Sequence, residues 1–118
     1  MALRMNRLST HVLDVARGKP AANIPVALAR RDNSDNWTLL LSAHTDADGR
    51  CAQLLPPAEA LSPGVYRLRF DIASYHAVQC VEALYPVIEI TFRVREGEST
   101  FHLPLLLSPY GYSTYRGS

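Results

Sequence analysis

The chain has 118 residues, of which 47% are apolar and 19% charged, and its mean hydropathy is close to zero. This composition is typical of one soluble globular domain and excludes an intrinsically disordered chain. The net charge of +1 gives no field that would attract nucleic acid or an anionic membrane, so we expect neither as a partner. We therefore expect a single domain over residues 1–118, with residues 1–7 as a flexible lead.

Alternation of apolar and polar residues recurs along the chain and predicts strands, because successive side chains of a strand point to opposite faces. Short turns rich in glycine, proline, aspartate and asparagine separate the alternating segments and favour antiparallel neighbours. The segments that show this alternation are 8–15, 24–28, 37–41, 65–72 and 87–95. It is clearest in 65–72 and 87–95.

Residues 73–84 lack this alternation and carry apolar side chains at spacings of three and four, which predicts one short helix. Six to eight strands and one helix over this length indicate an all-β fold. We expect a two-sheet antiparallel β-sandwich, because two facing sheets bury both of their apolar faces.

Three side chains that could carry chemistry, His11, Arg50 and His102, lie in or next to predicted strands. In residues 101–107 the odd positions are apolar and share one face, so His102 is expected to project from the opposite face. A histidine on the outer face of a sandwich is most often solvated or at an interface. The pattern does not settle the face of His11, and an arginine that follows a tight turn, as Arg50 does, is most often simply exposed.

No metal centre is predicted from these residue types. The turn at residues 46–49 is similar to a calcium loop, but that alignment places His44 first and Leu55 twelfth, and neither supplies the required oxygen ligand. Cys51 and Cys80 carry no nucleophile motif and are expected to be free thiols. No zinc-ligand spacing connects the four histidines, which are His11, His44, His76 and His102.

The C-terminal segment is aromatic and polar rather than charged. Tyr110, Tyr112 and Tyr115 fall within six residues, which suggests that the tail packs either on its own sheet or on a neighbouring subunit.

Four motifs follow one another along the chain. They are STHVLD at 9–14 with GKPA at 18–21, TDADGR at 45–50, FHLPLLLSP at 101–109, and YRGS at 115–118. Together they resemble the transthyretin-like family of 5-hydroxyisourate hydrolases, and the resemblance spans about residues 8–118. The YRGS motif separates the hydrolases from the hormone-carrying transthyretins. The departures from the family pattern, at His44, Asp46 and Phe101, fall on no residue assigned to chemistry.

The resemblance implies a transthyretin-type sandwich, assembled as a homotetramer from two dimers with active sites between the dimers. It implies hydrolysis of the cyclic amide of 5-hydroxyisourate to 2-oxo-4-hydroxy-4-carboxy-5-ureidoimidazoline, with no metal or organic cofactor. The catalytic residues would be His11 and His102, which activate water, and Arg50, which binds the substrate and stabilises developing charge. His11 would also contact the substrate, together with the tail residues Tyr115, Arg116, Gly117 and Ser118.

Two other functions remain open on the sequence. A non-catalytic transthyretin-like carrier would bind a small ligand in the same channel, although histidine and arginine suit a polar heterocycle better than an apolar hormone. A structural sandwich without a ligand is the second alternative. We expect a cytoplasmic location, because residues 4–12 fit an N-terminal peroxisomal address poorly at Met5 and Val12.

Overall fold

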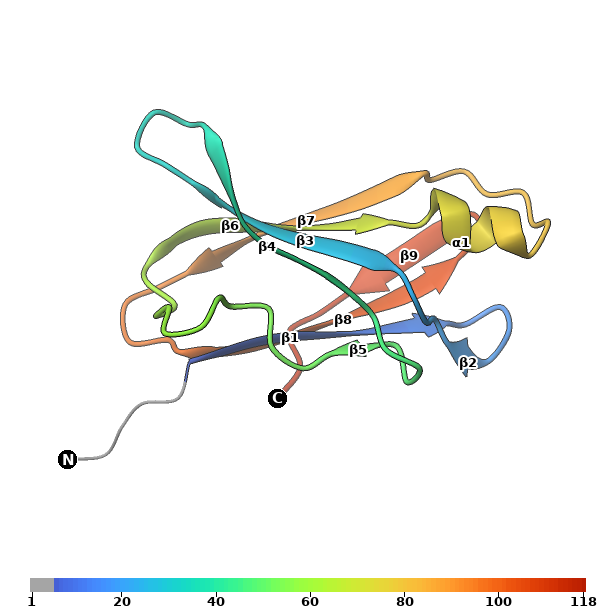
Figure 1. Cartoon of the computed structure of the whole chain (residues 1–118), viewed down its shortest axis with the longest axis horizontal. Helices are drawn as coiled ribbons and strands as arrows, with labels where there is room; N and C mark the ends of the chain where they lie inside the picture. The colour runs from blue at the N-terminus through green and yellow to red at the C-terminus, as the bar shows by residue number, and fades with distance from the viewer. Residues whose placement is uncertain (1–5) are drawn as a thin grey trace.

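Two β-sheets pack face to face over residues 6–118, the part of the chain that this computed structural model describes (Figure 1). The first sheet, sheet A, has the order β2 (Lys19–Pro20), β1 (Arg7–Asp14), β8 (Thr100–Ser108) and β9 (Gly111–Thr114), with β5 (Arg50–Cys51) also paired to β1. The second sheet, sheet B, has the order β4 (Trp37–His44), β3 (Pro25–Arg31), β6 (Gly64–Asp71) and β7 (Val87–Val94).

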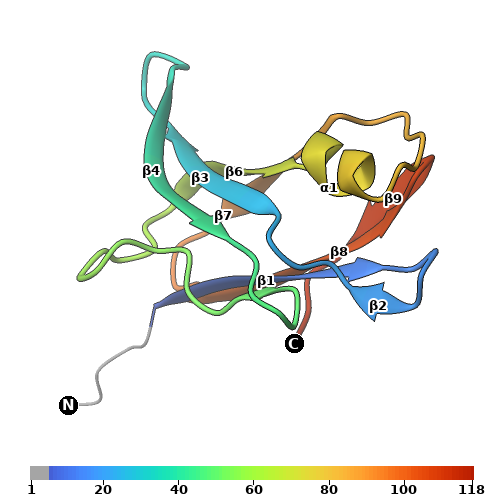
Figure 2. The ribbon, with the colours of Figure 1, turned by 45° about the vertical axis from the view of Figure 1, so that its right-hand side comes forward.

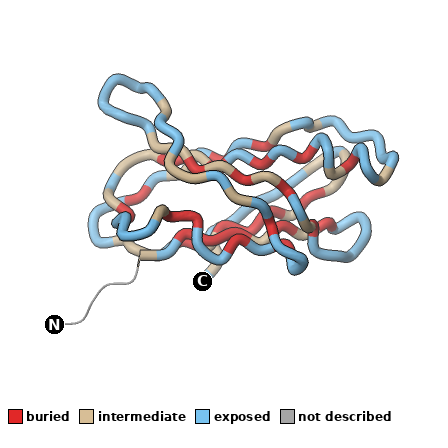
Figure 3. The backbone as a smooth tube through the Cα atoms, viewed as in Figure 1, coloured by how far each residue is buried: buried red, intermediate tan, exposed pale blue. Residues whose placement is uncertain are grey.

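The core lies between the sheets and comes from alternate positions of their strands (Figure 3). In β6, Leu68 and Phe70 are fully buried while Arg69 between them is exposed. In β8, Leu105 and Leu107 are fully buried as well. Each such side chain contributes about 2 kcal/mol through removal of apolar surface from water. The core therefore fixes which residues of sheet A point outward.

The two-sheet sandwich predicted from the sequence is confirmed, and the predicted strands 65–72 and 87–95 correspond to β6 and β7. Residues 6–118 hold nine strands rather than six to eight, two of which, β2 and β5, have only two residues. One pairing differs from the antiparallel expectation, because β1 and β8 run parallel over eight residue pairs. These strands come from opposite ends of the chain, so a long connection is available for a parallel pair.

The helix α1 (Ala73–Val78) is shorter than the predicted 73–84. It ends because Cys80 adopts a left-handed conformation with φ of 56°. The N–H of Val81 then donates to the carbonyl of His76, and the N–H of Cys80 donates to the carbonyl of Ala77. This pair of bonds is a Schellman motif, which usually has glycine where Cys80 stands. Figure 2 shows α1 at the end of the sandwich where β9 lies.

The predicted flexible lead, residues 1–7, falls outside the described residues except for its last two, and Arg7 begins β1. Cys51 and Cys80 are both free thiols, the first buried and the second exposed. No helix within residues 6–118 is long and apolar enough to cross a membrane.

Candidate active site

The outer face of sheet A carries the residues that the sequence analysis singled out. In β1, Leu8, Thr10 and Val12 point into the core and are buried, so Ser9 and His11 point outward. In β8 the neighbours of His102 are buried and His102 is half-buried on the outer face, as predicted. The burial of the alternate residues in β1 therefore settles the face of His11, which the sequence left open.

Arg50 joins this face through β5, where it pairs directly opposite His11. Side chains at directly opposed positions of an antiparallel pair have Cβ atoms about 5 Å apart. The guanidinium of Arg50 has no hydrogen-bond partner among the described residues, and its five donors are available to a ligand.

The turn before Arg50 is built by Asp46 and Gly49. One carboxylate oxygen of Asp46 accepts the N–H groups of Asp48 and Arg50, both at 2.9 Å. Gly49 has φ of 76° and packs against β1, and its carbonyl accepts the N–H of Val12 at 2.7 Å. A Cβ on Gly49 would lie 2.4 Å from the carbonyl oxygen of Val12, so this close approach requires glycine.

The same turn fixes the ring of His11. Nε2 of His11 lies 2.8 Å from the carbonyl oxygen of Asp48. A carbonyl oxygen only accepts hydrogen bonds, so Nε2 carries the proton. In the neutral ring Nδ1 is then left with a free lone pair, which can accept a hydrogen bond from water.

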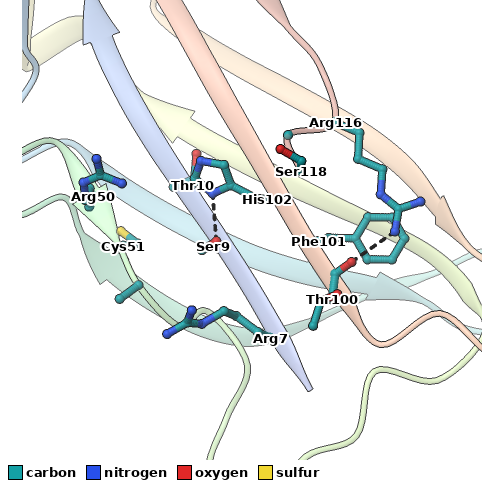
Figure 4. Close-up of a pocket in the computed structure, with 12 residues that line it drawn as sticks. Arg7, Ser9, Thr10, Arg50, Cys51, Thr100, Phe101, His102, Arg116 and Ser118 are labelled. Atoms are coloured by element: carbon teal, nitrogen blue, oxygen red, sulfur yellow. Dashed lines mark hydrogen bonds between the residues drawn. The ribbon is translucent and has the colours of Figure 1, made fainter. Parts of the chain in front are cut away.

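His102 is held by Ser9, the residue directly opposite it on β1. Ser9 Oγ and His102 Nδ1 lie 2.8 Å apart (Figure 4), which leaves Nε2 without a partner among the described residues. The pKa of His102 is lowered from 6.5, first by burial and then by electrostatic repulsion from His11, Arg50 and Arg7. The ring is therefore neutral at pH 7, the state that a general base needs.

The C-terminal tail runs along β8 beside His102. The N–H of Gly117 donates to the carbonyl of His102 at 2.7 Å, and the two residues form an isolated antiparallel bridge. At Gly117 the tail thus packs on its own sheet through its backbone. Tyr110 and Tyr115 are 65% and 56% exposed and contribute little to this packing, whereas Tyr112, 43% exposed, meets the ring of Tyr85 edge-on with 5.3 Å between the ring centres.

A cavity of about 690 Å³ opens between β1, β5, β8 and the tail. Figure 4 shows His102 between Arg50 and Arg7 on one side and Ser118 and Arg116 on the other. Of the seven residues predicted for the site, five line this cavity, and they are Arg50, His102, Arg116, Gly117 and Ser118. His11 and Tyr115 do not line it. Within residues 6–118 no three His, Cys, Asp or Glu side chains gather as a metal site would need.

Arg7 and Ser9 also line the cavity, although neither was predicted from the sequence as a site residue. The sequence held one indication for Ser9, since Ser9 lies two residues before His11 in the first predicted strand and therefore on the same face. Arg7 had none, because it lies in the segment expected to be a flexible lead.

Comparison with known proteins shows which family the chain belongs to. The profile of the HIUase/Transthyretin family matches residues 8–117. The 5-hydroxyisourate hydrolase of Mus musculus is 42% identical over 119 residues, which cover 100% of both chains. The structure of Klebsiella pneumoniae 5-hydroxyisourate hydrolase has a TM-score of 0.83 and 38% identity, covering 97% of this chain and 100% of that one.

Sea bream transthyretin, solved in complex with thyroxine, superposes with a TM-score of 0.86 at 31% identity and covers 93% of each chain. The fold is thus shared by hydrolases and transthyretins alike. On the match of its profile and its relatives, the chain belongs to the HIUase/transthyretin family.

Proposed function

We propose that this chain hydrolyses the cyclic amide of 5-hydroxyisourate in the cavity on the outer face of sheet A. Relatives that match the whole chain and are named 5-hydroxyisourate hydrolase support the activity. The observation that carries the site is that His102 and Arg50 line one cavity, while His11 pairs directly with Arg50.

His102 is the general base in this proposal. The proposal assigns the ring proton to Nδ1, which donates to Ser9 Oγ, so that Nε2 keeps a lone pair and can remove a proton from water. The water oxygen bonds to the amide carbonyl carbon, the ring C–N bond breaks, and the proton passes to the departing nitrogen. His11 does not line the cavity of the single chain but pairs directly with Arg50, which does. In the proposal it orients the water from beside Arg50, because its Nε2 is bonded to Asp48 and its Nδ1 can accept the second water hydrogen.

Arg50 binds the substrate and stabilises the oxyanion that forms at the attacked carbonyl. Its guanidinium offers a planar fork of donors to an oxygen-rich ring, which matches carboxylate-like or amide oxygens better than a lysine would. Arg7 adds a second positive charge to the lining. The tail residues Gly117 and Ser118 close the other side of the cavity, where the Ser118 hydroxyl can hydrogen-bond the ring.

A carrier function is the second candidate, since sea bream transthyretin was solved with thyroxine and shares this fold. The cavity lining argues against an apolar hormone here. Three arginines, a histidine, two serines and two threonines line it, whereas sites for drug-sized apolar ligands are mostly hydrophobic.

The homotetramer implied by the sequence resemblance belongs to the proposal as well. In the single chain the cavity is open to solvent on the outer face of sheet A, and Arg50 and Ser118 are exposed. A second subunit over this face would enclose the site and exclude bulk water, which strengthens electrostatic interactions within it. Sedimentation equilibrium at micromolar concentration is expected to give four chains per particle, and a monomer would remove this part of the proposal.

The activity itself is tested on freshly generated 5-hydroxyisourate, whose spontaneous decay is followed by ultraviolet absorbance. An enzyme accelerates the decay with many turnovers per chain. A carrier shifts the signal only in stoichiometric amount, and a scaffold leaves it unchanged. The proposal requires the first result and is overturned by either of the others.

A further inference from the structure

The guanidinium of Arg116 makes its contacts within the chain, although the side chain is 50% exposed. Its Nη1 donates to Oε2 of Glu98 at 2.7 Å, and its Nη2 donates to the carbonyl of Thr100 at 3.0 Å. The guanidinium carbon lies 3.9 Å from the centre of the Phe101 ring, a cation–π contact that Figure 4 shows together with the bond to Thr100. The guanidinium is thus held by the β7–β8 turn and by the first residues of β8.

Both carboxylate oxygens of Glu98 also accept hydrogen bonds within the chain. Its Oε1 accepts the backbone N–H of Arg95 at 2.7 Å, which closes the β7–β8 turn, and its Oε2 accepts Arg116. The Arg95 N–H first, and then Arg116, lower the pKa of Glu98, so the carboxylate is charged at neutral pH. Its side chain is 24% exposed, which is unusually covered for a glutamate in a turn.

The tail needs an anchor at this point because its strand pairing is interrupted. The bridge between His102 and Gly117 continues the register in which β8 pairs Leu105 with Thr114. Continuing that register places Tyr115 opposite Pro104, which has no N–H to donate. The carbonyl of Pro104 accepts the hydroxyl of Thr114 instead, at 2.7 Å. Beyond Thr114 the described contacts of the tail are the Gly117 bridge and the side chain of Arg116.

We propose that Glu98 is a positioning residue of the site, which fixes Arg116 and thereby holds Gly117 and Ser118 against His102. In this role Arg116 acts as an anchor of the tail, and its guanidinium does not contact the substrate. The effect on turnover rests on the proposed hydrolase function, whereas the anchoring itself can be measured without it.

If Glu98 and Arg116 formed only an ordinary surface ion pair, removing either side chain would change neither the tail nor turnover, since exposed pairs contribute little to stability. The proposal predicts a local effect on the tail and on turnover, with the melting temperature nearly unchanged. The test compares Glu98→Ala and Arg116→Ala with a control, Glu96→Gln. Glu96 is an exposed glutamate in the same turn. Hydrogen exchange at the Gly117 amide reports on the tail, and kcat/KM for 5-hydroxyisourate reports on the site.

Glu98→Ala is expected to accelerate exchange at Gly117 and to lower kcat/KM by about three- to tenfold, the usual range for loss of one hydrogen bond. Arg116→Ala should do the same, and the double variant should match the single variants, because both act through one contact. Glu96→Gln should change neither quantity.

Unchanged exchange at Gly117 in Glu98→Ala would overturn the anchor. Faster exchange with unchanged kcat/KM would overturn the positioning role. Additive effects in the double variant would show that the two residues act separately, which also overturns the proposal. If the unmodified protein fails to hydrolyse 5-hydroxyisourate, the proposed function falls, while the exchange measurement still decides the anchor.

Discussion

Ser9 Oγ and His102 Nδ1 lie 2.8 Å apart, at directly opposed positions of the one parallel strand pair in the described part of sheet A. The bond joins residues 93 positions apart in the chain. It fixes the orientation of the imidazole and leaves Nε2 free to contact a ligand or water. Ser9→Ala is therefore expected to lower kcat/KM by about three- to tenfold, since a net hydrogen bond contributes about 0.5–1.5 kcal/mol.

The matched control for this change is Ser42→Ala, an exposed serine of β4 in the other sheet. Steady-state kinetics on 5-hydroxyisourate should separate the two variants. Equal activity of Ser9→Ala and the unmodified protein would mean that the bond does not position the ring for turnover.

Gly49→Ala should destabilise the protein by about 2–4 kcal/mol. The substitution combines a positive φ of 76° with a Cβ only 2.4 Å from the Val12 carbonyl oxygen. Gly18→Ala is the control, because Gly18 has φ of 67° with nothing within 4 Å of the added Cβ, so only the backbone strain of about 1 kcal/mol applies. Urea denaturation gives both values, and similar losses in the two variants would argue against the steric clash.

Gly117→Ala should impair turnover without unfolding the sandwich. Its Cβ would lie 2.8 Å from Cδ2 of His102, so either the imidazole or the tail must move. We expect kcat/KM to fall about tenfold or more, because sub-ångström placement of a base affects proton transfer strongly. Gly111→Ala is the control, with its Cβ in ordinary contact 3.6 Å from Ser108 Oγ. A fully active Gly117→Ala protein would contradict the closeness of tail and base.

The pH dependence follows from the lowered pKa of His102, which burial and then electrostatic repulsion from His11, Arg50 and Arg7 depress below 6.5. A depressed pKa in the folded state means that His102 contributes stability above the ordinary histidine pKa, and that this contribution is lost as the pH falls through the folded-state pKa. Turnover that needs the neutral ring is lost over the same acid range.

Arg7→Gln removes one of these sources of repulsion, so the pKa of His102 should rise toward 6.5. The acid limb of the kcat/KM profile should then move to higher pH. Arg93→Gln is the control. It removes one positive charge from the exposed face of β7 in the other sheet and should not move the acid limb of the profile. A shift to lower pH in Arg7→Gln would have the wrong sign for this account.

Alternation predicted β6 and β7 well because each strand has one buried face and one solvent-exposed face, so apolar and polar residues alternate along its sequence. It could not predict that β1 pairs with β8 in parallel, since the alternation of a strand carries no information about its partner. The helix was predicted too long because its end depends on a left-handed Cys80, where no glycine marks the stop.

The site divides in the same way. The outward direction of His102 followed from its apolar neighbours in β8, whereas that of His11 became clear only from the burial of Leu8, Thr10 and Val12 in the folded β1. Arg50 and the tail were assigned from the family resemblance, and Glu98 carries no sequence signal, because its contact with Arg116 exists only once the tail has folded back along β8.

The central claim is that the two imidazoles on the outer face of sheet A activate water for hydrolysis of 5-hydroxyisourate. It is tested most directly by the kcat of His11→Ala and His102→Ala, with His44→Ala, an exposed histidine at the end of β4, as the control. We predict that each site variant loses about 10²-fold or more in kcat, the usual contribution of a positioned acid–base group, while the control keeps its activity. Near-normal turnover in both site variants would contradict the account.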